Sequence, residues 1–389
     1  MSARRTICVV TGSRADYGLL RSLLRAIARD ESLVLQLVAT GTHLSPEFGM
    51  TCQEIEADGF AIDARVEMLL SADSPVATAK SIGLGVLGFA DVLARLAPDI
   101  LVVLGDRFEI LAAAQTALVL RIPIAHIHGG EISEGAFDDS IRHALTKLAQ
   151  WHFVAAAPYR ARVVQMGEPP DRVFDVGAPG LDELSAIEWL DRAALAEALG
   201  LALGEPLLLV TYHPVTLGEQ DTTRPMAELL AALDTIAGAT IVFTYPNADT
   251  GGRAVRRCID PFVAAAPERR RLFTSLGRQR YLSAMRVADV VVGNSSSGLI
   301  EAPALKKATV NIGDRQKGRL MASSVISAEE RREDIARAIR QALSEGFRQG
   351  LAATVSPYGQ GDAGRQIKDR LRTVPLVLGK RFFDIPHGS

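Results

Sequence analysis

The fold class follows from one stretch of the sequence, Ile100-Leu101-Val102-Val103-Leu104-Gly105-Asp106-Arg107. Its first five residues are apolar at every position. A strand that is apolar on both faces is typical of a parallel sheet covered by helices on both sides. In such sheets ligands bind beyond the carboxyl ends of the strands, so Gly105, Asp106 and Arg107 stand where functional groups are expected.

Similar apolar, β-branched segments recur on both sides of this strand, and helical patterns separate them. In the first half of the chain the other expected strands are residues 6–11, 34–40, 124–127, 151–154 and 173–176, and expected helices include 19–28, 76–96 and 141–149. The alternation of strands and helices predicts an α/β fold with a parallel sheet.

A cluster of residues that break regular structure, Gly177-Ala178-Pro179-Gly180, interrupts this alternation. A second series of expected strands follows it, at residues 207–211, 240–245, 271–274, 290–292 and 309–312. We therefore predict two Rossmann-like domains, residues 1–177 and 178–372, that face each other across a cleft. Residues 373–389 form a tail, and its return to the first domain is left open.

Composition limits the class of protein. The 389 residues carry a formal net charge of −2, which argues against a nucleic-acid-binding protein. The three cysteines are widely spaced and fit neither a disulfide framework nor a Cys-x-x-Cys metal site, which favours a reducing cytoplasm. The N-terminal apolar run is too short for a signal peptide, and no segment approaches the ~20 apolar residues of a membrane span. We therefore expect a cytoplasmic protein with no nucleic-acid or membrane partner.

Acidic residues near the strand ends of the first domain are candidates for acid/base chemistry. Asp106 and Glu131 follow strands, and Asp138 stands at the start of a helical pattern. Clustered carboxylates raise one another's pKa, which suits general acid/base catalysis near neutral pH. The structural alternative is helix capping, by Asp106 with Glu109 at capping-box spacing, and by Asp138.

Two arginines of this domain are candidates for binding an anion. Arg14 lies in Thr-Gly-Ser-Arg-Ala-Asp-Tyr-Gly, which begins at Thr11, and Arg107 follows Asp106. A Gly/Ser turn that opens a helix presents N–H groups to an anion, and a guanidinium chelates phosphate or carboxylate. An ordinary tight turn is the alternative for the first motif.

The segment His126-Ile127-His128-Gly129-Gly130-Glu131 raises the question of a metal site. In a strand His126 and His128 point to the same face, and Glu131 or Asp138 would supply a third zinc ligand. However, the spacing matches no named zinc motif, and histidines at strand ends commonly form hydrogen bonds. We therefore expect no metal ion.

The second domain contains a turn suited to phosphate, Gly293-Asn294-Ser295-Ser296-Ser297-Gly298. Hydroxyls of Ser295 and Ser296, with N–H groups at the start of a helix, would form a neutral phosphate cradle. An ordinary serine-rich helix cap is the alternative. The Gly-Lys-Ser/Thr of a P-loop is missing, so ATP hydrolysis is not implied.

Charged residues follow this turn. Glu301 lies one to two helical turns later and suits ribose hydroxyls as a hydrogen-bond acceptor. Arg315, with Lys317 and Arg319, follows the last expected strand and suits the neutralisation of a diphosphate. A solvated basic loop is the alternative for these cations.

Taken together, the motifs resemble those of a known family, the hydrolysing UDP-N-acetylglucosamine 2-epimerases of sialic acid biosynthesis and their legionaminic-acid relatives. The resemblance covers nearly the whole chain in order. The motifs that carry it begin at Thr11, Gly105, His126, Asp138, Tyr212, Pro246, Gly293 and Asn311. It implies a two-domain GT-B fold, no metal, no cofactor, and a homo-oligomer, either a dimer or a tetramer.

The resemblance also implies roles for individual residues. The UDP-binding residues would be Arg14, Arg107, His213, Asn247, Ser295, Ser296, Glu301 and Arg315. The catalytic set would be drawn from Asp106, Glu131, Asp138, His128 and His213. Some family members carry a catalytic Glu at the position of His128, so either His128 or Glu131 takes that role here, and the sequence does not decide between them.

The implied reaction converts UDP-N-acetylglucosamine to N-acetylmannosamine and UDP. UDP leaves C1 as the C2 proton is removed, water adds to the resulting glycal, and a proton is delivered to the other face of C2. The same reaction on a UDP- or GDP-linked 2,4-diacetamido-2,4,6-trideoxy sugar is the alternative. More distant alternatives are a GT-B glycosyltransferase and a nucleotide-sugar sensor without turnover.

Overall fold

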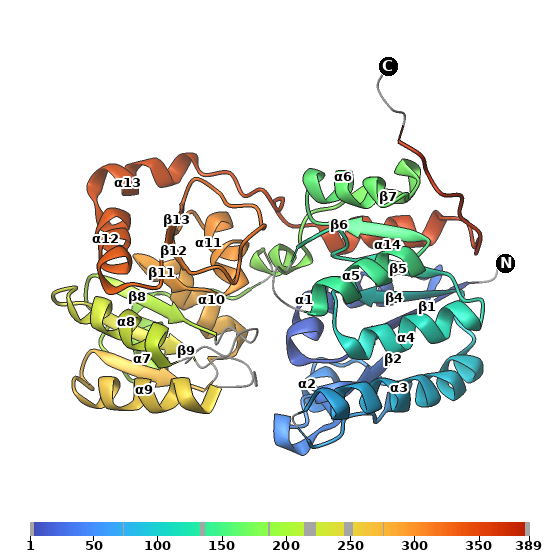
Figure 1. Ribbon diagram of the computed structural model, residues 1–389, viewed down its shortest axis with the longest axis horizontal. Coiled ribbons are helices and arrows are strands. Elements are labelled where there is room, and N and C mark those ends of the chain that lie inside the picture. The colour runs from blue at the N-terminus through green and yellow to red at the C-terminus, as the bar shows by residue number, and fades with distance from the viewer. Residues whose placement is uncertain are drawn as a thin grey trace. The chain divides into compact units, whose positions relative to one another are not determined.

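The computed structural model describes residues 4–72, 74–132, 137–185, 187–213, 223–244, 252–274 and 276–385. They form two compact α/β units (Figure 1). Among the described residues, unit 1 comprises 4–132, 137–183 and 358–385, and unit 2 comprises 184–357. The two parallel-sheet domains expected from the sequence are therefore confirmed.

Unit 1 is built on a seven-stranded parallel sheet with the strand order β3-β2-β1-β4-β5-β6-β7. Its strands are β1 Arg5–Thr11, β2 Leu33–Thr40, β3 Ala64–Val66, β4 Ile100–Leu104, β5 Ile124–Ile127, β6 Trp151–Val154 and β7 Val173–Asp175. Its helices are α1 Arg14–Ala28, α2 Cys52–Ala57, α3 Pro75–Leu96, α4 Phe108–Val119, α5 Phe137–Leu148, α6 Ala157–Gln165 and α14 Ala363–Thr373. Every residue of β4 is buried, as its apolar sequence predicts.

Apolar cores cover the two faces of this sheet. On one face Ile7 and Val102 pack with α1 and α14, and on the other Cys8 and Val103 pack with α3, α4 and α5. The alternation of neighbouring residues between the two cores follows from the two-residue period of a strand. Burial raises the pKa of the Cys8 thiol well above its usual range, which keeps this thiol protonated.

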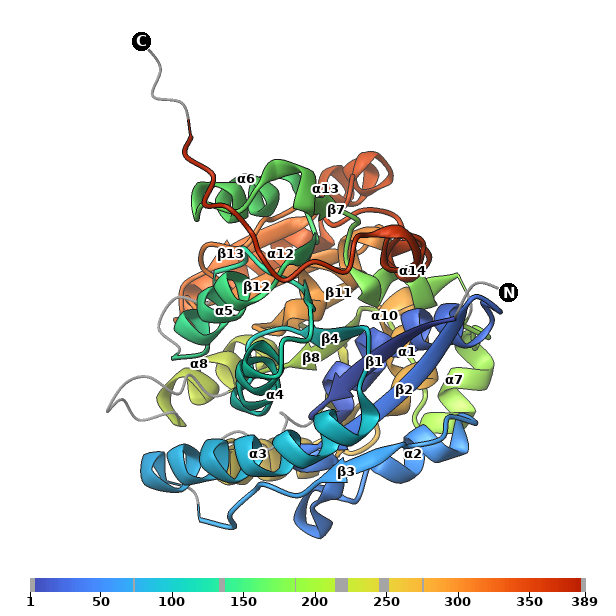
Figure 2. The ribbon, with the colours of Figure 1, turned by 90° about the vertical axis from the view of Figure 1, so that its right-hand side faces the viewer.

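The C-terminal segment returns to unit 1. Helix α14 packs on α1 (Figure 2), and the buried carboxylate of Asp182 accepts hydrogen bonds from the N–H groups of Ala363 and Gly364 at 2.8 and 2.6 Å. From the sequence, residues 178–372 were expected to form the second domain. The structure divides the chain after 183 instead and places 358–372 in unit 1, because α14 completes the core beside α1.

The tail beyond α14 is held by a buried charge cluster. The ammonium of Lys380 donates to the Ala149 carbonyl and to Glu168 Oε2, each at 2.6 Å. His152 and Lys147 also contact the Glu168 carboxylate. Burial by itself would raise the pKa of Glu168, but these three hydrogen-bond partners bring the pKa to about 2. The ionised carboxylate therefore anchors the tail.

Unit 2 contains a six-stranded parallel sheet with the order β10-β9-β8-β11-β12-β13. Its strands are β8 Leu207–Thr211, β9 Thr240–Thr244, β10 Arg270–Phe273, β11 Val290–Gly293, β12 Ala308–Ile312 and β13 Val325–Ala328. Its helices are α7 Arg192–Leu199, α8 Thr223–Asp234, α9 Gly252–Ala264, α10 Gly277–Val287, α11 Glu301–Ala304, α12 Arg332–Leu343 and α13 Glu345–Gly350. Apolar cores again cover both faces of the sheet.

Helix α3 corrects the expectation that no segment approaches the length of an apolar membrane span. By length and composition it is apolar enough to cross a membrane, and 28% of its most apolar window is buried in this structure. Core helices of folded domains meet the same criteria. On one side α3 packs against α4, where Phe89 and Leu93 are fully buried.

Candidate functional site

The carboxyl ends of β4 and β5 are joined by one buried arginine. Arg142 on α5 forms an ion pair with the Asp106 carboxylate, and its other terminal nitrogen donates to the His128 carbonyl at 2.9 Å. Asp106 follows β4, whereas His128 follows β5, two strands that pair in parallel. The predicted candidates Asp106 and His128 are thus held at the same edge of the sheet.

Asp106 does not cap helix α4, contrary to the structural alternative considered above. The N-cap residue is Arg107, which makes no side-chain capping bond. The guanidinium of Arg107 instead contacts the buried Glu109 carboxylate with two nitrogens, at 3.2 and 2.8 Å. Glu109 therefore orients Arg107 rather than forming a capping box, and the Asp106 carboxylate is engaged by Arg142.

The two histidines of the β5 motif have different environments. His126 donates from Nε2 to the Gly105 carbonyl at 2.8 Å, and Thr146 lies 3.3 Å from its Nδ1. Burial lowers the pKa of His126 to about 3, so this imidazole is neutral and structural. No group of three or more His, Cys, Asp or Glu side chains able to hold a metal ion occurs within the described ranges.

His128 and Glu131 form a buried dyad. Nδ1 of His128 contacts Oε1 of Glu131, and both side chains are more than nine-tenths buried. Nε2 of His128 is also buried, and among the described residues it has no hydrogen-bond partner. The backbone of His128 adopts a φ of +65°, a left-handed conformation that residues other than glycine seldom adopt. Such strain is concentrated at functional sites.

Two further carboxylates near this edge have raised pKa values. Asp138 lies inside the first turn of α5, and burial, followed by repulsion from Asp106, raises its pKa to about 6. Burial raises the pKa of Asp16 to about 6 as well, and the positive charge of Arg107 partly opposes the shift. Asp16 belongs to the motif that begins at Thr11, but no role was predicted for it from the sequence. Its signal was an acidic residue in the first turn of a helix that follows a central strand.

The raised pKa of Asp16 predicts a pH dependence of stability. The folded state holds this proton more tightly than the unfolded chain, so the contribution to stability is present below about pH 4 and is lost as the pH rises through about 6. We expect Asp16→Asn to increase the free energy of unfolding more at pH 7.5 than at pH 4.5. Urea titrations at both pH values measure this difference. An equal effect at both would contradict the assignment, and the exposed Asp171→Asn is the control.

Arg14, unlike the carboxylates described above, has an exposed side chain. It begins α1, where the Ser13 hydroxyl caps the helix by accepting from the Asp16 N–H at 3.3 Å. Its guanidinium lies 3.3 Å from the Glu54 carboxylate, and both side chains are nearly half exposed. The structure thus shows a capped strand–helix turn with an exposed cation. Binding of an anion by Arg14 stays a prediction.

In unit 2, hydrogen bonds of Asn294 connect the turn of residues 293–298 to neighbouring segments. Its side chain accepts from the His213 N–H at 2.7 Å and donates to the His213 carbonyl at 2.8 Å. Its own carbonyl accepts from Arg315 at 3.0 Å and from Gln316 at 2.8 Å. The predicted candidates His213 and Arg315 are therefore fixed to the turn by Asn294, a residue that the sequence analysis did not assign.

Glycine is required where this turn leaves the sheet. Gly293 has a φ of +137°, and a Cβ at this position would lie 1.9 Å from the Thr211 carbonyl oxygen of the neighbouring strand. A side chain at position 293 would push β11 away from β8. The close approach keeps Asn294 within reach of His213, which follows β8.

The serines form a chain of hydroxyls. Ser295 Oγ lies 3.0 Å from Ser297 Oγ, which lies 2.6 Å from the Tyr281 hydroxyl on α10. A helix was expected after this turn, and the structure has a 3₁₀ turn, Ser296–Gly298, followed by the four-residue helix α11. The macrodipole of a long helix is therefore missing, and hydroxyls and first-turn N–H groups remain to bind an anion.

The other candidates of unit 2 are placed as follows. Glu301 is the first residue of α11 and follows the serine turn after two intervening residues. Asn247, together with the motif that begins at Pro246, lies outside the described residues. Ser295, Ser296, Glu301, His213 and Arg315 thus all belong to the carboxyl ends of β8, β11 and β12 or to the segments that follow them.

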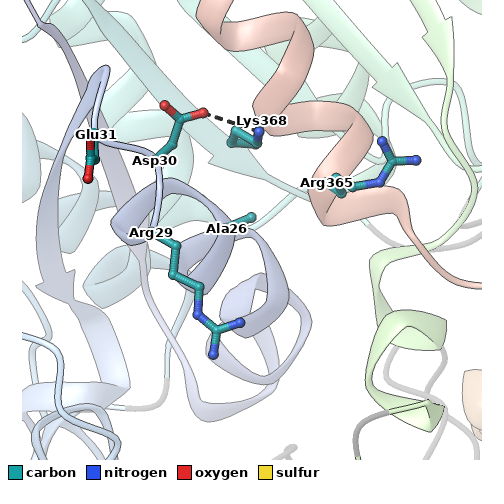
Figure 3. Close-up of a pocket in the computed structure, with 6 residues that line it drawn as sticks. All are labelled: Ala26, Arg29, Asp30, Glu31, Arg365 and Lys368. Atoms are coloured by element: carbon teal, nitrogen blue, oxygen red, sulfur yellow. Dashed lines mark hydrogen bonds and ion pairs between the residues drawn. The ribbon is translucent and has the colours of Figure 1, made fainter.

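A pocket elsewhere on unit 1 contains none of the predicted site residues. Its volume is about 460 Å³, and it lies where α1 ends beside α14 (Figure 3). The lining residues are Ala26, Arg29, Asp30, Glu31, Arg365 and Lys368. Lys368 is 3.2 Å from Asp30, and Arg365 pairs with Asp362 and Asp369. The Lys368–Asp30 pair links α14 to the segment after α1, whereas the pairs of Arg365 lie at the start of and within α14 itself.

The sequence is similar to one protein family and to relatives whose activity is described. Residues 25–372 match the family described as UDP-N-acetylglucosamine 2-epimerase. The chain is 40% identical over 98% of its length to the whole GDP/UDP-N,N'-diacetylbacillosamine 2-epimerase (hydrolyzing) of Campylobacter jejuni. It is 36% identical, over 96% of its length and 97% of the relative, to the UDP-N,N'-diacetylbacillosamine 2-epimerase (hydrolyzing) of Legionella pneumophila.

A solved structure shares the fold. The UDP-GlcNAc 2-epimerase of Neisseria meningitidis bound to UDP-GlcNAc superposes with a TM-score of 0.78, over 94% of this chain and 99% of that one. At 18% identity this likeness concerns the fold, which is the two-domain α/β architecture expected of the GT-B type. On the family match and the two full-length relatives, the chain belongs to the UDP-N-acetylglucosamine 2-epimerase family.

Proposed function

We propose that this protein is a hydrolysing 2-epimerase whose substrate is N,N'-diacetylbacillosamine linked to UDP or GDP. The observation that carries the proposal is its similarity, over nearly the full length of each chain, to two relatives described as acting on that sugar. From the sequence, UDP-N-acetylglucosamine was the first candidate and the diacetamido sugar was the second. The relatives favour the opposite order, and UDP-N-acetylglucosamine becomes the second candidate.

The proposal assigns the proton transfers to unit 1. Epimerisation needs one group that removes the C2 proton and another that returns a proton to the opposite face of C2. Asp106 and His128 support this assignment because Arg142 holds them at the same sheet edge. Asp138 is a third candidate, since its raised pKa of about 6 allows both protonation states near neutral pH.

His128, rather than Glu131, is proposed as the second acid/base group. Glu131 contacts Nδ1 of His128 and so fixes the ring and its tautomer, as the carboxylate of a catalytic triad does. Nε2 is then the atom left to exchange a proton with the substrate. Glu131 is a positioning residue in this scheme, and His128 is the acid/base group of the two.

The proposal assigns the nucleotide to unit 2. When the C1–O bond breaks, its electron pair leaves with the diphosphate while the C2 proton goes to a base, and a glycal forms. Donors already in place stabilise the departing charge, and Ser295, Ser296, Arg315 and His213 are the proposed donors. Glu301 would accept from the ribose hydroxyls, and Arg14, Arg107 and Asn247 would complete the nucleotide site. Water then adds to C1 and a proton to C2.

The test compares two nucleotide-sugars without any acceptor. We expect free 2-epimerised sugar and nucleoside diphosphate to form, deuterium from heavy water to appear at C2, and kcat/KM to be at least about tenfold higher for the diacetamido sugar than for UDP-N-acetylglucosamine. A preference for UDP-N-acetylglucosamine would reverse the assignment of substrate. Turnover only with an acceptor would indicate a glycosyltransferase, and stabilisation by ligand without turnover would indicate a sensor.

A further inference from the structure

The segment that follows α14 lies against the end of α5 and the end of α6 (Figure 2). In this segment the ammonium of Lys380 donates to the carbonyls of Thr146 and Ala149, at 3.3 and 2.6 Å. The last carbonyls of an α-helix have no partner within the helix, and a cation beside them also complements the helix dipole. Lys380 therefore caps α5 from a position more than 230 residues later in the chain.

The capping ammonium is itself fixed. Lys380 Nζ is 2.6 Å from the carboxylate of Glu168, whose side chain is fully buried, and only 14% of the Lys380 side chain is exposed. Close to it in the chain, the N–H of Phe383 donates to the carbonyl of Gly167 at 2.9 Å. A cation that is held by a buried partner and by the main chain has little freedom to leave the helix end. The cap is therefore a fixed part of unit 1.

The capped end of α5 is connected to the end of β4. Thr146, in the last turn of α5, is fully buried, and its Oγ1 lies 3.3 Å from Nδ1 of His126. Nε2 of His126 donates to the carbonyl of Gly105 at 2.8 Å. Gly105 directly precedes Asp106, so a continuous series of contacts leads from the cap to the proposed acid/base group.

The same turn of α5 also packs against the segment that contains His128. A Cβ added at Gly129 would lie 3.1 Å from Thr146 Oγ1, so little space separates this turn from the residue after His128. One turn earlier on α5, Arg142 bridges the Asp106 carboxylate and the His128 carbonyl. The position of α5 thus decides where this bridge lies, and the capped end is one of the places at which that position is fixed.

We propose that Lys380 is a positioning residue for the reaction, because its cap on α5 keeps Arg142 where it bridges Asp106 and His128. This inference rests on the proposed function, which assigns the proton transfers to Asp106 and His128. Without the cap the end of α5 would fray, and the two groups would be held less precisely. A shift of a reacting group by about 1 Å can lower a rate about a hundredfold.

The first test compares two lysines that tie the C-terminal segment to unit 1. Lys380→Met removes the cap, whereas Lys368→Met, the matched control, removes the ion pair with Asp30 after α1. The exposed fraction is 14% for both lysine side chains. At a temperature where all chains are folded, we expect Lys380→Met to lower kcat for the nucleotide-sugar about tenfold and to change KM less than about twofold. Lys368→Met should leave both constants close to those of the wild type.

The kinetic result separates positioning from simple stabilisation. A residue that only stabilises the fold would lower the melting temperature and leave kcat of the folded protein unchanged. Unchanged kcat in Lys380→Met, or an equal loss of kcat in Lys368→Met, would therefore overturn the proposal. A loss that appears mainly in KM would also overturn it, because the proposed acid/base groups act after the substrate has bound.

The second test needs no substrate and is therefore independent of the proposed function. Amide hydrogen exchange, followed by mass spectrometry, should be faster across residues 142–148 in Lys380→Met than in the wild type, and unchanged there in Lys368→Met. Equal exchange in Lys380→Met and the wild type would overturn the proposal whatever the reaction. If the wild-type chain turns over neither nucleotide-sugar, the proposed function fails, and the exchange result alone decides whether Lys380 holds Arg142.

Discussion

Asp106→Asn is expected to lower turnover of the nucleotide-sugar about a thousandfold, within the range that a positioned acid/base group contributes. Asparagine keeps the size of the side chain but can neither take nor return the C2 proton. The proposed UDP contacts lie largely in other residues, so the dissociation constant for UDP should change less than about threefold. Steady-state kinetics and titration calorimetry with UDP measure the two quantities.

The matched control for this substitution is Asp139→Asn. Asp139 lies in the first turn of α5, and its carboxylate is 3.4 Å from His143. The control removes one negative charge from α5, the helix that carries Arg142, and leaves the Asp106–Arg142 ion pair in place, so we expect turnover close to that of the wild type. Turnover of Asp106→Asn equal to the control would remove Asp106 from the catalytic set. Loss of UDP binding would show that the residue acts through the structure of the site.

His128→Gly is expected to reduce turnover by about 10²–10⁴-fold, because the proposed acid/base group is lost. The backbone at this position is left-handed, and glycine adopts that conformation without strain, so the variant should fold. Free imidazole should enter the space left by the side chain and raise the turnover of the variant at least about tenfold. No such increase is expected if His128 has only a structural role. Kinetics with and without imidazole give the answer.

Glu131→Gln distinguishes the two members of the dyad. If Glu131 is a positioning residue, Glu131→Gln should lower kcat about tenfold and leave KM nearly unchanged. This decrease is smaller than the one expected for His128→Gly. Glu131→Asp should recover part of this loss. If Glu131→Gln is more damaging than His128→Gly, and imidazole restores nothing, then Glu131 is the acid/base group and His128 supports it.

Much of the fold was predictable because parallel strands buried on both faces have continuous apolar sequences. Every strand expected from the sequence is present within a residue or so at the described positions. Two strands at sheet edges were missed, β3 and β13. Each has three or four residues and only partial burial, so neither has the continuous apolar run that marks a central strand. The return of α14 depends on contacts with α1 more than 300 positions away, which local patterns do not record.

The candidate site was predictable where it follows strands directly. Asp106 and His128 stand at the ends of expected strands, whereas the role of His213 was implied by the family resemblance, and the roles of all three stay predictions. The residues that connect them were not found, because Arg142 reaches Asp106 across 36 positions and Asn294 reaches His213 across 81. A hydrogen bond between distant segments leaves no periodic signal. The helix-capping alternative for Asp106 failed for the same reason, since its real partner lies on another helix.

The return of α14 has a consequence for the order in which the chain is made. Synthesis proceeds from the N-terminus, yet unit 1 needs residues 358–385, whereas residues 184–357 of unit 2 are contiguous. The whole of unit 2 therefore leaves the ribosome before unit 1 has all of its chain. Until then the face of α1 that Ile367 and Leu371 will cover stays open to water or to chaperones. The segment translated after unit 2 closes the core of unit 1.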